Sequence, residues 1–112
     1  VILEGVDSEQ SKAALYSTVH GAGRVLSRTQ AKGKVRKGRQ IREGAVTPEM
    51  MFGWLREAGV ELRGGGLDES PHCYKRLHEV LDHHSDTVRV LHTHTPIGVD
   101  MAGEDVVDPY KD

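Results

Sequence analysis

The pattern of apolar and polar positions predicts short strands alternating with short amphipathic helices. The apolar run at residues 1–6 and the β-branched, alternating stretch at residues 87–99 predict strands, the second stopped or bent at Pro96. A third short strand is expected at residues 60–64. Helical stretches separate these strands, and the chain shows no internal repeat. The pattern predicts an α+β or a mixed α/β fold, and α+β is the class we expect.

Two helices are expected in the first third of the chain. Asp7 or Ser8 can cap a helix that runs through residues 11–17. A second helix is expected over residues 23–31, where the residues at helical spacing are Val25, Leu26 and Thr29.

Two later stretches carry a stronger start signal, in which a cap residue is followed by a proline. Thr47 and Pro48 open a helix that ends at Gly59, and its apolar face consists of Met51, Trp54, Leu55 and Ala58. Ser70 and Pro71 repeat the signal and predict a helix whose inner face consists of Cys73, Leu77, Val80 and Leu81.

Size and composition narrow the class of protein. The chain has 112 residues, the length of one small domain. It has no apolar run near the ~20 residues of a membrane span, and its N-terminus lacks the pattern of a signal peptide. The single cysteine excludes an internal disulfide, so a reducing, cytoplasmic setting is expected. Because the chain opens on an apolar run without a Met, we expect it to be part of a larger protein.

Charge is unevenly distributed, although the formal net charge is only -2. From Lys12 to Arg42 every charged residue is basic: Lys12, Arg24, Arg28, Lys32, Lys34, Arg36, Lys37, Arg39 and Arg42. Within this run, glycines interrupt residues 32–42, which predicts a loop or a loose ribbon. Such a block attracts polyanions, most often the phosphates of RNA or DNA. The alternative is a solvated loop or helix face.

The segment "STVHGAGR" places His20 directly before a glycine turn. A glycine-rich loop that opens a helix is an anion site, and Gly21 and Gly23 let the backbone approach a phosphate closely. A neutral ring nitrogen of His20 can attack phosphorus or act as an acid or base, and Arg24 can neutralise charge on phosphoryl oxygens. The alternative is a capped histidine with a purely structural role.

The remaining histidines allow a second kind of chemistry. His92 and His94 lie two residues apart on an expected strand, and a further group surrounds an expected helix: His72, His78, His83 and His84. These residues could bind zinc or manganese, but no third ligand lies at a set spacing, so we expect packed or exposed histidines and assign no metal ligand in this chain. Cys73 is expected to be a core residue.

Three motifs together resemble the RtcB family of RNA ligases: "ILEGVDSEQSKAALYSTVHGAGR", "GLDESPHCYKRLHEVL" and "VLHTHTPIGVDMAG". The resemblance covers nearly the whole chain and implies that residues 1–112 are the C-terminal portion of an RtcB-type fold. It comprises the HGAG motif at residues 20–23, the basic loop at 32–42 and a tail at 100–112.

The resemblance also implies roles for individual residues. His20 would take GMP from GTP as a phosphoramidate, and Gly21, Ala22 and Gly23 would line the guanylate site. Tyr74 would lie near the nucleotide. Lys111 is the candidate for a guanine-contacting lysine that some members carry at the C-terminus. RNA is expected to contact cations of the basic run: Arg24, Arg28, Lys34, Arg36, Lys37 and Arg39.

The implied activity is GTP- and Mn²⁺-dependent ligation of RNA, as in tRNA splicing and RNA repair. RNA ends with a 2′,3′-cyclic phosphate or 3′-phosphate would be joined to 5′-hydroxyl ends. The metal ligands are expected outside this chain, so we expect the isolated chain to be inactive. An activating protein such as archease is an expected partner. The alternative is a non-catalytic RNA-binding module that uses the basic run.

Overall fold

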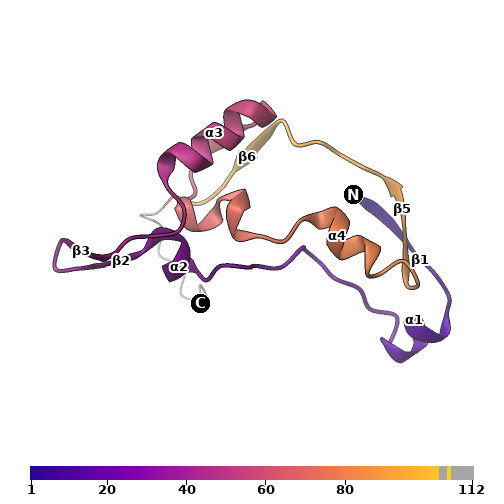
Figure 1. The fold of residues 1–112 in the computed structure, drawn as a ribbon. Helices are drawn as coiled ribbons and strands as arrows, with labels where there is room; N and C mark the ends of the chain where they lie inside the picture. Colours follow the sequence, from indigo (N-terminus) through magenta and orange to yellow (C-terminus); the bar gives the residue numbers. More distant parts are fainter. Residues whose placement is uncertain (104–105, 107–112) are drawn as a thin grey trace. The chain divides into compact units, whose positions relative to one another are not determined.

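The computed structural model describes residues 1–103 and residue 106. These residues form short helices and three two-stranded sheets, which confirms the α+β class. Their contacts divide the chain into two units (Figure 1). Unit 1 contains Val1–Arg24 and Lys75–Thr95, and unit 2 contains Val25–Tyr74 and the segment from Pro96. In the described part of the chain, no helix is both long enough and apolar enough to cross a membrane.

Unit 1 is built on an antiparallel strand pair. Strand β1 (Ile2–Gly5) pairs with strand β5 (Val88–His92), with Leu3 opposite Val90. Both strands were predicted, although β5 ends at His92, before the proline that was expected to stop it. His94 therefore lies outside the strand, and the expected pairing of His92 and His94 on one strand face is wrong.

Helix α1 (Glu9–Ala13) begins where the sequence indicates, with Ser8 as its cap. The Ser8 hydroxyl accepts a hydrogen bond of 3.0 Å from the Ser11 backbone N–H. The helix is shorter than predicted, because Leu15 and Tyr16 adopt left-handed φ angles of 55° and 53°, which a right-handed helix cannot contain.

The helix expected from Ser70 does not form as one element. Pro71–Cys73 make a single 3₁₀ turn (η2), and helix α4 begins later and covers Leu77–Asp82. The Ser70 hydroxyl makes no capping hydrogen bond to the turn, and it lies 2.9 Å from Nδ1 of His72. Tyr74 is then extended, so Cys73 and Leu77 do not share a helix face.

Unit 2 surrounds the main apolar core, whose buried members are Ala31, Val46, Met51, Leu55 and Cys73. Helix α3 (Pro48–Ala58) supplies two of them and has the predicted bounds. Thr47 caps it by accepting a 3.2 Å hydrogen bond from the Met50 backbone N–H, and Gly59 ends it in a left-handed conformation. The expected inner face is only half right, since Trp54 and Ala58 are exposed. Cys73 is a core residue, as predicted.

Helix α2 (Arg28–Lys32) starts later than the sequence pattern predicted. Ser27 and Gln30 form a reciprocal capping box that fixes the start. The preceding backbone bends and does not continue the helix, because the Val25 N–H donates a 2.8 Å hydrogen bond to the Cys73 carbonyl. The prediction of a helix over residues 23–31 is therefore wrong.

The glycine-punctuated basic segment is a ribbon, one of the two expected forms. Strand β2 (Lys34–Arg36) pairs with strand β3 (Arg39–Arg42) through a two-residue turn. Lys37 and Gly38 both have positive φ, 52° and 73°, as a type I′ hairpin turn requires. The hairpin projects away from the core of unit 2 (Figure 1).

The remaining elements of unit 2 complete its core. Strand β4 (Glu61–Arg63), which was predicted, pairs in parallel with strand β6 (Gly98–Asp100). Between β4 and η2, a 3₁₀ turn covers Leu67–Glu69 (η1) and buries Asp68. The acidic residues of η1 face helix α2, as the ion pairs below show.

Candidate functional site

The HGAG motif lies in unit 1 on an irregular segment between helix α1 and the end of the unit at Arg24. The side chain of His20 is exposed, and its ring makes no hydrogen bond with any described residue. The segment is held at its far end, where the Lys75 N–H donates a 3.0 Å hydrogen bond to the Gly23 carbonyl. An imidazole presented in this way is open to an incoming phosphorus atom.

Both glycines of the motif leave their backbone uncovered. A Cβ atom placed on Gly21 or Gly23 would have no described atom of a distant residue within 4 Å. Gly23 has a φ of 81°, so this position favours glycine for conformational reasons as well. Ala22 between them is half-buried. A ligand can therefore approach the backbone at both glycines.

One part of the sequence argument for an anion site is wrong. The motif was expected to open a helix, whose N-terminal N–H groups would bind phosphate. The next helix, α2, begins only at Arg28, because the Ser27 capping box sets its start. Arg24 is half-buried on extended chain and does not lie inside a first helical turn.

Arg28 lies in a network with one buried and one half-buried carboxylate in unit 2. Its Nη1 is 3.0 Å from Oδ2 of Asp68 and also bonds Oε1 of Glu69. Lys32 adds a second cation 3.6 Å from Oδ1 of Asp68. Hydrogen bonds to Glu69 first, and then to Asp68, raise the pKa of Arg28 above its ordinary value. Arg28 is therefore a cation with structural partners, and a contact between Arg28 and RNA stays a prediction.

Tyr74 belongs to the same network. Its hydroxyl donates to Oε2 of Glu69, and its ring packs against the core of unit 2. The sequence did not indicate Asp68 or Glu69 as partners of Arg28 and Tyr74. The available signal was a pair of acids one residue after a glycine run, which is also typical of an ordinary turn.

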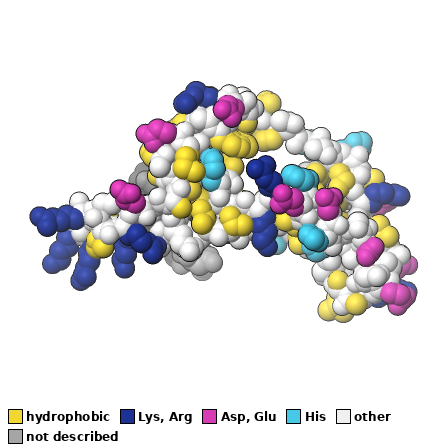
Figure 2. All heavy atoms as spheres, viewed as in Figure 1, with side chains coloured by type: hydrophobic (Ala, Val, Ile, Leu, Met, Phe, Trp, Pro, Cys, Tyr) yellow, Lys and Arg dark blue, Asp and Glu magenta, His cyan; other side chains and the backbone are white. Residues whose placement is uncertain are grey.

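The hairpin gathers the other predicted RNA contacts on one side. Residues 34 and 36 of β2 share a face, and the register places Arg42 opposite Lys34 and Arg39 opposite Arg36. We call this set of four cations, Lys34, Arg36, Arg39 and Arg42, the basic face. Figure 2 shows basic side chains crowded over the hairpin. Lys37 lies in the turn between the strands.

The acids in the described part of the chain do not neutralise the basic face. Among the described residues, no ion pair involves Lys34, Arg36, Lys37 or Arg39. The Arg42 guanidinium donates to the Thr29 carbonyl, at 3.4 Å, and forms no ion pair with a described acid. Like charges directly opposite each other destabilise a strand pair, so a polyanion that binds here would relieve a repulsion.

The described residues contain no group of three His, Cys, Asp or Glu side chains that could hold a metal ion.

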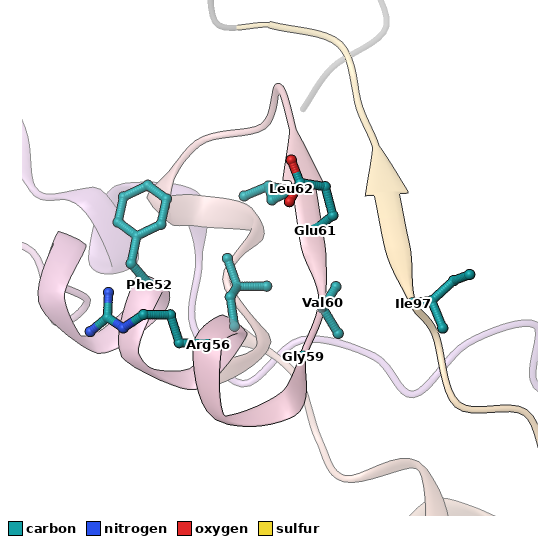
Figure 3. A pocket seen from close by; sticks show the side chains of 8 residues that line it. Phe52, Arg56, Gly59, Val60, Glu61, Leu62 and Ile97 are labelled. Atoms are coloured by element: carbon teal, nitrogen blue, oxygen red, sulfur yellow. The ribbon is translucent and has the colours of Figure 1, made fainter.

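A surface pocket of about 510 Å³ lies beside helix α3 and strand β4 in unit 2 (Figure 3). Phe52 and Ile97 supply apolar walls, and Arg56 and Glu61 line it as well. None of the predicted site residues lines this pocket. Lys111 lies outside the described residues.

Comparison with known proteins gives the family. The sequence model of the protein family described as tRNA-splicing ligase RtcB matches residues 1–101 of this chain. The matched residues include the HGAG segment, the hairpin and Tyr74. The chain belongs to the RtcB family. This confirms the resemblance that the sequence motifs carried.

Two curated RtcB relatives are similar to this chain. They are the RNA-splicing ligases RtcB of Mycobacterium bovis and Mycobacterium tuberculosis, each 36% identical over 91 residues. These alignments cover 76% of this chain and 18% of each relative, so the chain spans about a fifth of the length of these RtcB proteins. No solved structure matches the chain.

Proposed function

We propose that this chain carries the nucleophile of a GTP-dependent RNA ligase. The observation that carries the proposal is the exposed His20 ring in an HGAG segment that lies inside the RtcB family match. Both relatives are named as RNA-splicing ligases, which supports ligation of RNA as the reaction of the whole protein. In this proposal the substrates are GTP and RNA ends of the kind produced in tRNA splicing and RNA damage.

The proposed first step uses the His20 imidazole as a nucleophile. A neutral ring nitrogen attacks the α-phosphorus of GTP, an N–P bond forms, and the bond to pyrophosphate breaks. The uncovered backbone at Gly21 and Gly23 supports close binding of the guanylate there, with Ala22 between them. Tyr74 and Lys111 are proposed nucleotide contacts, and Arg24 would neutralise charge on phosphoryl oxygens.

Two further transfers complete the proposed reaction. The RNA 3′-phosphate attacks the guanylate phosphorus, which breaks the N–P bond and frees His20. The 5′-hydroxyl of the second RNA end then attacks the activated 3′-phosphate, releases GMP and loses its proton as the phosphodiester forms. A 2′,3′-cyclic phosphate must first be opened to a 3′-phosphate.

Manganese is expected from the family, but the described residues do not fit a metal site, since no three potential ligands lie together among them. We derive no step through a metal here, and in this proposal its ligands come from elsewhere in the whole protein. We also propose a cytoplasmic location and an activating protein such as archease as a partner.

RNA binding is assigned to the basic face. Its cations have no acidic partner among the described residues and lie on a projecting hairpin, which suits contact with a phosphate backbone. The same face is the observation that favours the second candidate function, a non-catalytic RNA-binding module. The two candidates differ in whether a covalent GMP adduct forms.

The deciding experiment incubates the full-length protein with α-labelled GTP and Mn²⁺ and follows label on denaturing gels. We expect an acid-labile, alkali-stable adduct and RNA ligation, both abolished by His20→Ala. His78→Ala is the matched control, because His78 is another exposed histidine of unit 1 and should leave both signals intact. A labelled adduct in the His20→Ala protein would overturn the assignment. RNA binding without any adduct in the wild type would favour the module.

A further inference from the structure

Both carboxylate oxygens of Glu69 accept hydrogen bonds in the network around Arg28. One oxygen, Oε1, accepts from the Arg28 guanidinium, and the other, Oε2, accepts from the Tyr74 hydroxyl. The Glu69 side chain is only 14% exposed. A carboxylate held at both oxygens and shielded from water has one orientation, so it fixes where the Tyr74 hydroxyl lies.

Arg28 is fixed from the opposite side. Asp68, whose side chain is 2% exposed, binds Arg28 through Oδ2 and faces Lys32 through Oδ1. Among the described residues, two carboxylates and two cations meet in this network.

The network connects three segments that are distant in the sequence. Arg28 lies in helix α2, Glu69 in turn η1, and Tyr74 directly follows turn η2. An apolar cluster of similar volume can stabilise a fold as much as a buried ion-pair network does. What the ion-pair network adds is that it holds its side chains in one arrangement. At Tyr74 that gain is a phenol ring whose direction is set before any ligand arrives.

We propose that Arg28 and Glu69 are positioning residues that orient Tyr74 for contact with the nucleotide. This inference rests on the proposed function, in which Tyr74 contacts the guanylate. In this role Arg28 and Glu69 act on the nucleotide through Tyr74. A preoriented ring saves the entropy of ordering it when GTP binds, so loss of the network weakens GTP binding more than it slows transfer to His20.

The test measures His20 guanylylation by the full-length protein as a function of GTP concentration. Tyr74→Phe keeps the ring and removes the hydroxyl, and Glu69→Gln keeps the shape and removes the charge. We expect each to raise KM for GTP on the order of tenfold, the scale of a lost charge-assisted hydrogen bond, with kcat within about twofold of wild type. Arg28→Lys, which retains a cation, should lie between wild type and Arg28→Ala.

Two comparisons separate positioning from a merely structural role. Lys32→Ala is the matched control, because Lys32 pairs with Asp68 but not with Glu69, and it should leave KM for GTP unchanged. The double variant Tyr74→Phe with Glu69→Gln should raise KM no more than Tyr74→Phe alone, since both remove the same contact. Thermal melting of each variant checks that the conservative changes leave the protein folded.

The outcomes are distinct. Unchanged KM in Tyr74→Phe and Glu69→Gln, additive effects in the double variant, or an equal rise in Lys32→Ala would each overturn the positioning role. A wild-type protein that forms no GMP adduct would instead overturn the proposed function, and this result is visible before any variant is made.

Discussion

Removal of three cations from the basic face is the sharpest test of RNA binding by the hairpin. The triple variant Lys34→Ala, Arg36→Ala and Arg39→Ala takes away side chains that have no ion-pair partner among the described residues. The fold should tolerate the change, because the register places Arg36 and Arg39 directly opposite each other, and their repulsion disappears. We therefore expect the melting temperature to stay the same or to rise slightly.

The magnitude follows from counterion release. Each phosphate contact contributes about 0.7 to the salt slope for a single strand and about 0.9 for a duplex, so three lost contacts lower the slope of log affinity against log salt by about 2 to 3. If the two proteins bind equally at 1 M salt, this change in slope corresponds to RNA binding weakened about a hundredfold or more at 0.1 M salt. Guanylylation of His20 in the absence of RNA should be spared.

The assay is a fluorescence-anisotropy titration of labelled RNA at several salt concentrations, with the full-length protein. A charge-matched control removes three arginines away from the hairpin, Arg56, Arg63 and Arg89, and should keep the wild-type slope. Two of these already pair with acids, Arg63 with Glu61 and Arg89 with Glu4. A triple variant with the wild-type slope, or a control with an equally reduced slope, would refute the reasoning.

Two further predictions concern stability and the isolated chain. Gly44→Ala should lower the free energy of unfolding by about 3 kcal/mol or more, because its Cβ would overlap the Ala31 carbonyl oxygen and lie within 2.7 Å of backbone atoms of Lys32 and Gly33, which cannot move aside. Gly53→Ala should instead raise the free energy of unfolding by about 0.5–1 kcal/mol, because Gly53 lies within helix α3 and the new Cβ would approach the end of the Arg56 side chain only. Chemical denaturation of both variants measures whether each change in this free energy is a loss or a gain. The 112-residue chain alone should form no GMP adduct with GTP and Mn²⁺, whereas the full-length protein should form one that EDTA abolishes; an adduct on the isolated chain in a labelling gel would disprove this.

Local signals in the sequence predicted the elements that local chemistry controls. Thr47, Pro48 and Gly59 give helix α3 its bounds, because a hydroxyl cap, a first-turn proline and a left-handed glycine each act within a few residues. The same cap-and-proline signal at Ser70 failed. There the serine hydroxyl contacts His72, and the chain becomes extended at Tyr74. A cap residue followed by a proline therefore does not by itself ensure that a helix continues beyond the first turn.

Distant contacts explain the errors around helix α2. Val25 and Leu26 sit at helical spacing with Thr29, yet both backbone N–H groups donate to the Cys73 carbonyl. Spacing along the chain does not reveal a partner about fifty residues away. The motif itself was recognisable from residues 20–23, but the irregular conformation that exposes His20 was not.

The basic run illustrates what a charge count can and cannot predict. From the sequence, all nine cations between Lys12 and Arg42 belong to one block. In the structure, Lys12 pairs with Glu9, and Arg28 and Lys32 pair with acids that follow the glycine run near residue 65. The hairpin cations keep no acidic partner among the described residues and even oppose one another across the strands. A cation already paired with a carboxylate releases few counterions when RNA arrives, so its contribution to the salt slope is small. The five hairpin cations, the basic face and Lys37, should therefore contribute about 3.5 to 4.5 to the salt slope at most, which is less than the full count of nine cations would give.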